Sequence, residues 1–125
     1  NVFGTINLIR LLAPHMGGVT KSHIVNIGSM GGFQGSKKFP GLTVYSASKG
    51  ALSILSECLA EEFAEKNIIV NCLAIGSVNT EMLNKAFPGY QSRIEPEQMA
   101  TYIVNFCVEG KNFVNGKVVP VSLYT

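Results

Sequence analysis

The sequence contains no aspartate, and all 8 of its acidic residues are glutamate. This absence excludes a Ser-His-Asp triad and the aspartate-rich loops that usually bind calcium or magnesium. Charged residues make up only 14% of the chain, and the net charge of +2 comes from scattered lysines without a basic run. A nucleic-acid-binding role therefore has no electrostatic support, and no metal site is expected.

Cysteine is also scarce. The three cysteines, Cys58, Cys72 and Cys107, are odd in number, widely spaced and set in apolar runs. This pattern disfavours a disulfide framework or a zinc site, and it predicts buried, reduced thiols in a cytoplasmic protein.

Long apolar runs are missing too, although 46% of the residues are hydrophobic. No run approaches the length of a membrane span, and the amino-terminal residues lack the basic region and cleavage site of a signal peptide. The first residue, Asn1, is not Met and lies within a helical pattern. We therefore expect residues 1–125 to be part of a larger domain whose amino-terminal half is absent, with some apolar surface contacting that half or another subunit.

The remaining pattern is that of one α/β unit without repeats or linkers. A near-continuous apolar run at residues 68–75 predicts a strand buried on both faces of a parallel sheet, and shorter runs at 24–27 and 118–123 predict two more strands. Asn115-Gly116, before the last strand, fits either a hairpin that pairs 111–114 with 117–120 or a simple lead-in turn.

Helical periodicity covers most of the rest, with the first helix apolar on more than one side. The predicted helices span residues 1–13, 44–66, 80–87 and 96–110. The 44–66 helix has two apolar stripes, one suited to packing on a sheet and the other to close packing on a partner helix. They are Leu52, Leu55, Leu59 and Phe63, and Ala47, Ala51, Ile54 and Cys58. Its glutamates, Glu57, Glu61, Glu62 and Glu65, are interpreted as a solvated face.

Residues 28–41 are rich in glycine and polar side chains and are predicted to form a loop. A phosphate cradle leads directly into a helix, whereas about a dozen residues intervene here, so a phosphate site is disfavoured. The run Gly28-Ser29-Met30-Gly31 differs from the Gly-x-Ser-x-Gly nucleophile elbow, and both histidines precede Ser29. Hydrolase chemistry is rejected.

Tyr45 and Lys49 lie four residues apart at the start of a predicted helix, and therefore one turn apart on the same face. An ammonium beside a phenol favours the phenolate, so such a tyrosine can exchange a proton with a carbonyl or alcohol oxygen. The pair alone is a weak signal, because tyrosine and lysine meet at this spacing readily by chance.

Four motifs in order carry a more specific resemblance. They are Asn1-Val-Phe-Gly4 on a helix, the strand 24–29 ending in Ser29, Tyr45-Ser-Ala-Ser-Lys49-Gly-Ala, and Val70-Asn71-Cys-Leu-Ala-Ile-Gly76-Ser-Val78-Asn-Thr80. Over essentially its whole length the chain resembles the carboxy-terminal half of the short-chain dehydrogenases/reductases. The resemblance implies a Rossmann-like, doubly wound parallel sheet and NAD- or NADP-dependent hydride transfer between a nicotinamide and a small carbonyl or alcohol substrate.

The resemblance also assigns roles to individual residues. Tyr45 matches the general acid/base, Lys49 the lysine that assists the tyrosine and holds the nicotinamide ribose, and Ser29 the serine that hydrogen-bonds the substrate oxygen. Asn1 matches an asparagine that positions a water for proton relay. The loop expected to meet the nicotinamide carboxamide contains Ile75, Gly76, Val78 and Thr80.

Several departures limit the resemblance. Ile75-Gly76 stands where Pro-Gly is usual, the spacing from Ser29 to Tyr45 is longer than usual, and the glycine-rich dinucleotide loop is absent. The choice between NAD and NADP and the identity of the substrate therefore stay open, and the chain alone is expected to be inactive.

Two alternatives stay open beside the oxidoreductase. An epimerase or dehydratase of the wider superfamily shares the Tyr-Lys pair, although the Ala-Ser-Lys-Gly-Ala context disfavours it. A binding or structural fragment without turnover is the second. Apolar faces on the 1–13 and 44–66 helices predict a homo-oligomer, either a dimer or a tetramer.

Overall fold

The structure is a computed structural model that describes residues 2–124. Three parallel strands form one sheet in the order β1-β2-β3, with β1 at Ser22–Ser29, β2 at Ile68–Ile75 and β3 at Val118–Val121. The α-helices are α1 (Val2–Leu12), α2 (Thr43–Glu62), α3 (Glu81–Ala86) and α4 (Pro96–Glu109). Each helix was predicted, although α2 is shorter than the predicted 44–66 helix, because the end of that segment forms the 3₁₀ turn Ala64–Lys66.

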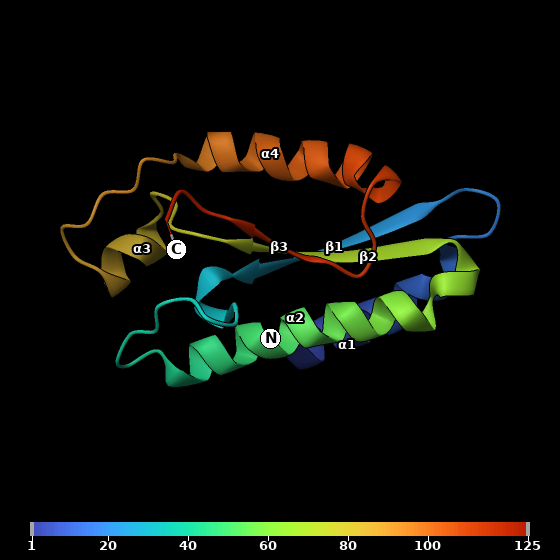
Figure 1. Cartoon of the computed structure of the whole chain (residues 1–125), viewed down its shortest axis with the longest axis horizontal. Helices are drawn as coiled ribbons and strands as arrows, with labels where there is room; N and C mark the ends of the chain where they lie inside the picture. Colours follow the sequence, from blue (N-terminus) through green and yellow to red (C-terminus); the bar gives the residue numbers. More distant parts are fainter. Residues whose placement is uncertain (1, 125) are drawn as a thin grey trace.

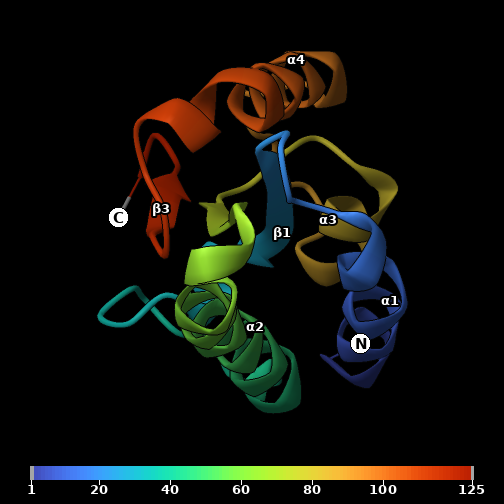
Figure 2. The ribbon, with the colours of Figure 1, turned by 90° about the vertical axis from the view of Figure 1, so that its right-hand side faces the viewer.

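The helices form layers on both faces of the sheet. In Figure 1, α4 lies above the sheet and α1 and α2 lie below it, and the end-on view in Figure 2 shows the same three layers. Parallel strands with helices on both faces confirm the prediction of a doubly wound α/β fold. None of the helices within residues 2–124 is long and apolar enough to cross a membrane.

The core is centred on β2, the middle strand. Ile68, Val70 and Leu73 are at most 1% exposed, because β2 pairs along both edges and is covered on both faces. The observed bounds of β2 are those predicted from its apolar run.

Strand β1 is longer than the apolar run at 24–27, and it ends at Ser29 as the resemblance to the family implied. It pairs with β2 in continuous register from Ser22 with Ile68 to Ser29 with Ile75. Gly28 and Ser29, predicted to open a loop, therefore belong to the strand, and Met30–Gly32 form a 3₁₀ turn rather than irregular loop. Pairing with β2, which local sequence does not encode, extends the strand.

The connection into β3 is a lead-in turn, and the hairpin alternative is wrong because β3 pairs parallel to β2. Gly116 has φ +70°, a conformation that suits glycine, and its N–H donates to the Val70 carbonyl at 2.8 Å. Asn71, fully buried, holds this turn: its Oδ1 accepts from Lys117 N and its Nδ2 donates to Val114 O, both at 3.0 Å.

Asn71 also orients His23 on the neighbouring strand. Asn71 Nδ2 lies 3.0 Å from His23 Nε2, and His23 Nδ1 lies 3.0 Å from the Cys107 carbonyl of α4. Because Nε2 faces a donor, the proton of the neutral ring resides on Nδ1 and is donated to Cys107. Burial lowers the pKa of His23, which favours this neutral form.

The two helices of the lower layer are more exposed than predicted. Only Ile9 of α1 is buried, while Phe3 and Leu11 are 81% and 69% exposed, so α1 packs on one side within this chain.

The three cysteines differ in their exposure. Cys58 and Cys107 are exposed and only Cys72 is buried, which corrects the prediction of three buried thiols.

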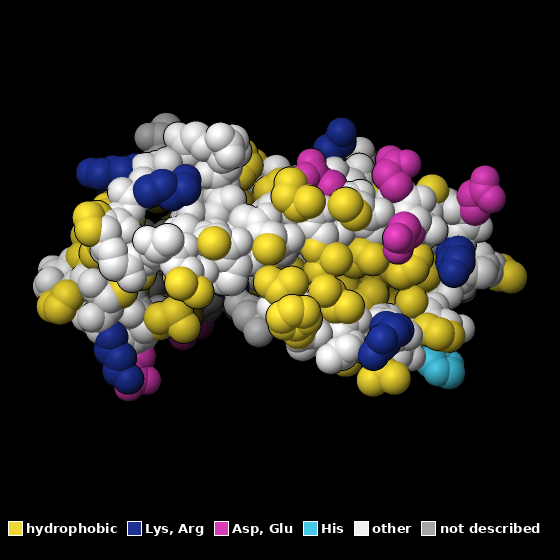
Figure 3. Space-filling view, turned by 90° about the horizontal axis from the view of Figure 1, so that it is seen from below, with side chains coloured by type: hydrophobic (Ala, Val, Ile, Leu, Met, Phe, Trp, Pro, Cys, Tyr) yellow, Lys and Arg dark blue, Asp and Glu magenta, His cyan; other side chains and the backbone are white. Residues whose placement is uncertain are grey.

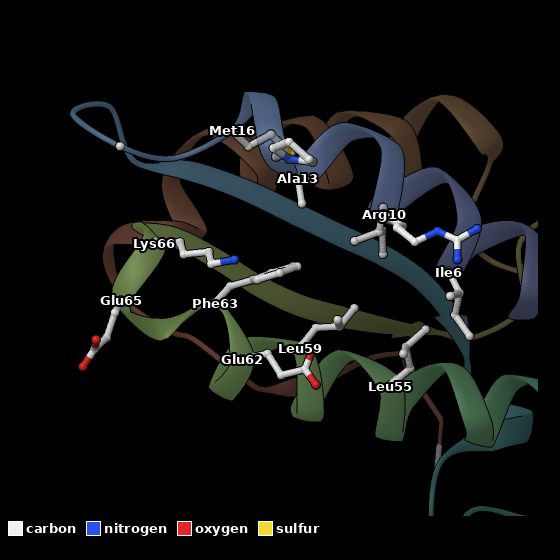
Figure 4. Close-up of a pocket in the computed structure, with 13 residues that line it drawn as sticks. Ile6, Arg10, Ala13, Met16, Leu55, Leu59, Glu62, Phe63, Glu65 and Lys66 are labelled. Carbon is white, nitrogen blue, oxygen red and sulfur yellow. The ribbon is translucent and has the colours of Figure 1, made fainter.

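The α2 face on the sheet is also not the predicted apolar stripe. The buried α2 residues are Leu52, Ser53, Ser56 and Ala60. Leu55, Leu59 and Phe63 instead line a groove of about 740 Å³ between α1 and α2, together with Ile6 and Ile9 (Figures 3 and 4). Small side chains on the buried face let α2 lie close to the sheet.

Candidate functional site

Ser29 is the last residue of β1, at the carboxyl edge of the parallel sheet. Its Oγ accepts a hydrogen bond from Gly31 N at 3.0 Å and so caps the 3₁₀ turn that follows. The Ser29 hydroxyl proton is not used in that contact and can be donated to a ligand.

The turn after Ser29 packs directly on α2. A Cβ placed on Gly32 would lie 2.4 Å from Gly50 N and 2.5 Å from Lys49 C, so only glycine permits this approach. The close packing fixes the end of β1 against the helix turn that carries Lys49.

Gly31 lies between the Ser29 and Tyr45 side chains. A Cβ placed on Gly31 would be 3.4 Å from Ser29 Oγ, from Ser46 Oγ and from Tyr45 Cε2. Ser29 and Tyr45, which are 16 positions apart in the sequence, thus approach each other around Gly31, which has no side chain. The structure therefore places Ser29 and Tyr45 side by side.

Tyr45 stands in the first turn of α2 and is 38% exposed. The Lys49 ammonium lies 5.9 Å from the centroid of the Tyr45 ring, as expected for residues one turn apart. Lys49 Nζ also donates to the Ile27 carbonyl at 3.3 Å, which turns it toward the end of β1. One of its three N–H groups is used there, which leaves donors for a ligand.

The second wall of the site is the segment after β2. Ile75 pairs with Ser29, so the loop that begins at Gly76 leaves the same edge of the sheet. Val78 is 9% exposed, and the Thr80 hydroxyl accepts from Leu83 N at 3.2 Å as the N-cap of α3. The Thr80 hydroxyl proton remains available to a ligand.

The structure therefore gathers Ser29, Tyr45 and Lys49 beside the 75–80 loop, whereas the predicted residue Asn1 lies outside the described residues. Sequence reasoning missed Gly31 and Ser46, which share the space between Ser29 and Tyr45, and the pair Asn79 and Ser92 behind the loop. Gly31 had a local signal in the glycine run, but nothing in the sequence marks the contact of Asn79 with Ser92.

The chemistry open to this group is proton transfer and hydrogen bonding at an oxygen atom. Within residues 2–124, no group of three or more His, Cys or Glu side chains is placed to hold a metal ion. The thiol nearest the site, Cys72, lies within hydrogen-bonding distance of Ser53, and burial raises its pKa, so it is a poor nucleophile.

Comparison with known proteins gives concordant results. The family model for short chain dehydrogenases matches residues 1–91. Dehydrogenase/reductase SDR family member 4 of Mus musculus is 34% identical to this chain over an alignment of 134 residues in length. The alignment covers 98% of this chain and 47% of the mouse protein.

Solved structures agree with this match. ElxO with NADP bound is 30% identical with a TM-score of 0.77, over 95% of this chain and 52% of ElxO. A 3-oxoacyl-(acyl-carrier-protein) reductase from Brucella melitensis with bound NAD is 29% identical with a TM-score of 0.74, over 95% of this chain and 46% of the reductase. The chain thus spans about half the length of these proteins, and it belongs to the short-chain dehydrogenase family.

Proposed function

We propose that the protein is an NAD- or NADP-dependent oxidoreductase that interconverts a carbonyl and an alcohol. The observation that carries this proposal is the grouping of Ser29, Tyr45 and Lys49 at the carboxyl edge of the sheet, around Gly31. Ligands of open α/β sheets bind at this edge.

The side chains divide the work at the substrate oxygen. Tyr45 donates a proton to the carbonyl oxygen during reduction and takes it back during oxidation. Ser29 donates a hydrogen bond to the same oxygen, because its Oγ already accepts from Gly31 N. The Lys49 ammonium stabilises the phenolate that Tyr45 leaves behind.

The cofactor assignment draws on the relatives, since ElxO is solved with NADP and the Brucella reductase with NAD. A bound nicotinamide would exchange a hydride with the substrate carbon. Lys49 and Tyr45 would hold its ribose, and Ile75, Gly76, Val78 and Thr80 would face its carboxamide. The free donors of Lys49 and Thr80 fit these roles. Asn1 would position a water near Lys49.

The test is a hydride-transfer assay on the protein joined to its nucleotide-binding half. With NADH or NADPH deuterated at the nicotinamide and a panel of ketones and aldehydes, we expect deuterium on the carbon of the product alcohol. Oxidation of the cofactor without labelled alcohol, or a product with a changed stereocentre and no net redox change, would contradict the proposal and favour the epimerase alternative.

We also propose that residues 1–125 are the carboxy-terminal half of the catalytic domain and are inactive alone. The chain covers 47% of its mouse relative and 52% of ElxO. Calorimetry of the 125-residue chain is expected to show no tight binding of NADH or NADPH. Micromolar binding would contradict this division of the site, because residues 1–125 would then bind the cofactor without the other half.

We further propose that the protein self-associates through α1 and α2. Leu11 on α1 and Ile54 on α2 are 69% and 60% exposed, and the groove between the helices is apolar (Figure 3). The Leu11→Glu/Ile54→Glu protein is expected to sediment as a monomer at concentrations where the parent associates, because each carboxylate would have to be desolvated.

The matched control is Val104→Glu, on α4 at the opposite face, which is also 60% exposed. It is expected to leave association unchanged. A parent protein that is monomeric at high concentration would contradict the proposal.

A further inference from the structure

The loop proposed to face the nicotinamide separates from the sheet directly after β2 ends at Ile75. Gly76 N donates to Val121 O at 2.8 Å, which within residues 2–124 is the last backbone bond between this segment and β3. Beyond it the chain runs out through α3 and returns at residues 92–95 before α4 begins. Something other than strand pairing must hold the loop at residues 77–80.

Asn79 supplies most of that restraint. Its Oδ1 accepts from Ser92 N at 2.6 Å, and its Nδ2 donates to Ser92 O at 2.8 Å and to Glu95 Oε1 at 2.8 Å. Its backbone N–H donates to Ile94 O at 2.9 Å. One residue is thus joined to three residues of the returning segment.

Ser92 completes the closure from the other side. It is 8% exposed, and its Oγ donates to Ser77 O at 2.8 Å and accepts from Ile94 N at 3.1 Å. The Ser77 hydroxyl lies 3.2 Å from Ser92 Oγ as well. We call Ser77, Asn79, Ser92 and Glu95 the polar clasp. It joins the two ends of the excursion through residues 80–91.

The clasp has a consequence for the site. Val78 and Thr80 flank Asn79, so fixing Asn79 also restrains these two of the four residues assigned to the nicotinamide carboxamide. Because the clasp closes at the base of the excursion, it holds Asn79 through contacts that do not involve α3. A loop held only by its own backbone would move with α3.

We propose that Asn79 is a positioning residue, which holds the Val78–Thr80 loop at the nicotinamide through Ser92 and Glu95. The inference rests on the proposed hydride-transfer function. It adds that cofactor placement depends on a residue whose side chain is bonded to Ser92 and Glu95 rather than assigned to the cofactor or substrate.

The first test is hydrogen exchange, which needs no turnover. In Asn79→Ala, hydrogen exchange at the amides of residues 79, 92 and 94 is expected to rise at least about tenfold. Local opening of the loop then costs less free energy, because the side-chain hydrogen bonds of Asn79 no longer have to be broken. In the complete protein the same substitution is expected to raise the KM for NADH or NADPH about tenfold, with kcat changed less than threefold.

A paired substitution tests the donor at position 79. Asn79→Asp keeps the acceptor for Ser92 N but loses both Nδ2 bonds and places a second carboxylate against Glu95. Protection from hydrogen exchange is therefore expected to fall as in Asn79→Ala. Adding Glu95→Gln supplies an amide donor to the new carboxylate and restores one of the two lost bonds, so part of the protection and of the cofactor KM should recover. A residue that merely stabilised the fold would not be rescued in KM by this exchange of groups.

Asn112→Ala is the control, since the exposed Asn112 side chain makes no hydrogen bond within residues 2–124 and lies on the turn after α4. Unchanged exchange in Asn79→Ala would show that the clasp does not hold the loop. Faster exchange with an unchanged cofactor KM would overturn the positioning role. Failure of the parent protein to transfer deuterium would instead contradict the proposed function.

Discussion

The Tyr45→Phe protein is expected to lose about 10²- to 10⁴-fold in kcat for carbonyl reduction, which is the usual contribution of a placed general acid. The substitution removes the only proton donor that the proposal places on the product alkoxide, and it leaves the aromatic ring beside Gly31 in place. The Tyr45 hydroxyl makes no hydrogen bond within residues 2–124, so the free energy of unfolding should stay within about 0.5 kcal/mol of the parent.

The measurement is steady-state turnover of NADH or NADPH by the complete protein, with urea unfolding to confirm the fold. Tyr102→Phe on α4 is the matched control, because Tyr102 is 42% exposed and Tyr45 is 38% exposed. The control should keep parental kcat. Parental turnover by Tyr45→Phe would sink the proposed mechanism, since another group would have to supply the proton.

The largest effect on stability is expected at Asn71. Asn71→Ala should lower the free energy of unfolding by about 3 to 5 kcal/mol, because Lys117 N and Val114 O lose their partner in a partly buried turn and His23 Nε2 loses its donor. Asn71 is 0% exposed, so the substitution also removes packed side-chain atoms from the interior.

Urea unfolding followed by circular dichroism measures the change, with Asn26→Ala as the control. Asn26 is also a buried asparagine of the sheet, 8% exposed, but it donates a single side-chain bond, to Ser56 Oγ. Ser56 still donates to Leu52 O afterwards, so the control should cost about 1 kcal/mol. Equal losses at Asn71 and Asn26 would contradict the assigned role of Asn71.

A milder substitution keeps the test informative if Asn71→Ala does not fold. Asn115→Ala removes one acceptor from the same turn, the Oδ1 that accepts from Val70 N at 3.0 Å. The donor left behind, Val70 N, belongs to a residue that is 0% exposed, and a loss of about 1 to 2 kcal/mol is expected from this single bond. No loss would show that the turn into β3 does not depend on its asparagine side chains.

Features with local causes were predictable from the amino-acid sequence. The bounds of β2 follow from an apolar run that is buried on both faces, and α4 begins at Pro96, a residue suited to the first turn of a helix. The placement of Lys49 one turn from Tyr45 follows from helix geometry alone. Periodicity and spacing along the chain are enough for features of this kind.

Features that join distant parts of the chain were not predictable. The family motif implied that β1 ends at Ser29, but the pairing of Ser29 with Ile75 and the contacts of Asn71 with Val114 and Lys117 in the turn before β3 are visible only in the fold. The two faces of α2 could be told apart only in the folded structure. Ser53 and Ser56 lie on the face that packs closely on the sheet, whereas Leu59 and Phe63 line the groove.

The same division holds within the site. The residue types for proton transfer and their order, from Ser29 through Tyr45 to Lys49, are present in the linear sequence. The folded chain adds the Gly31 position between Ser29 and Tyr45 and the polar clasp behind Val78 and Thr80. Chemistry depends on side-chain identity, which the sequence states directly, whereas placement depends on contacts between residues far apart in the chain, which form only when the sheet and its helices pack.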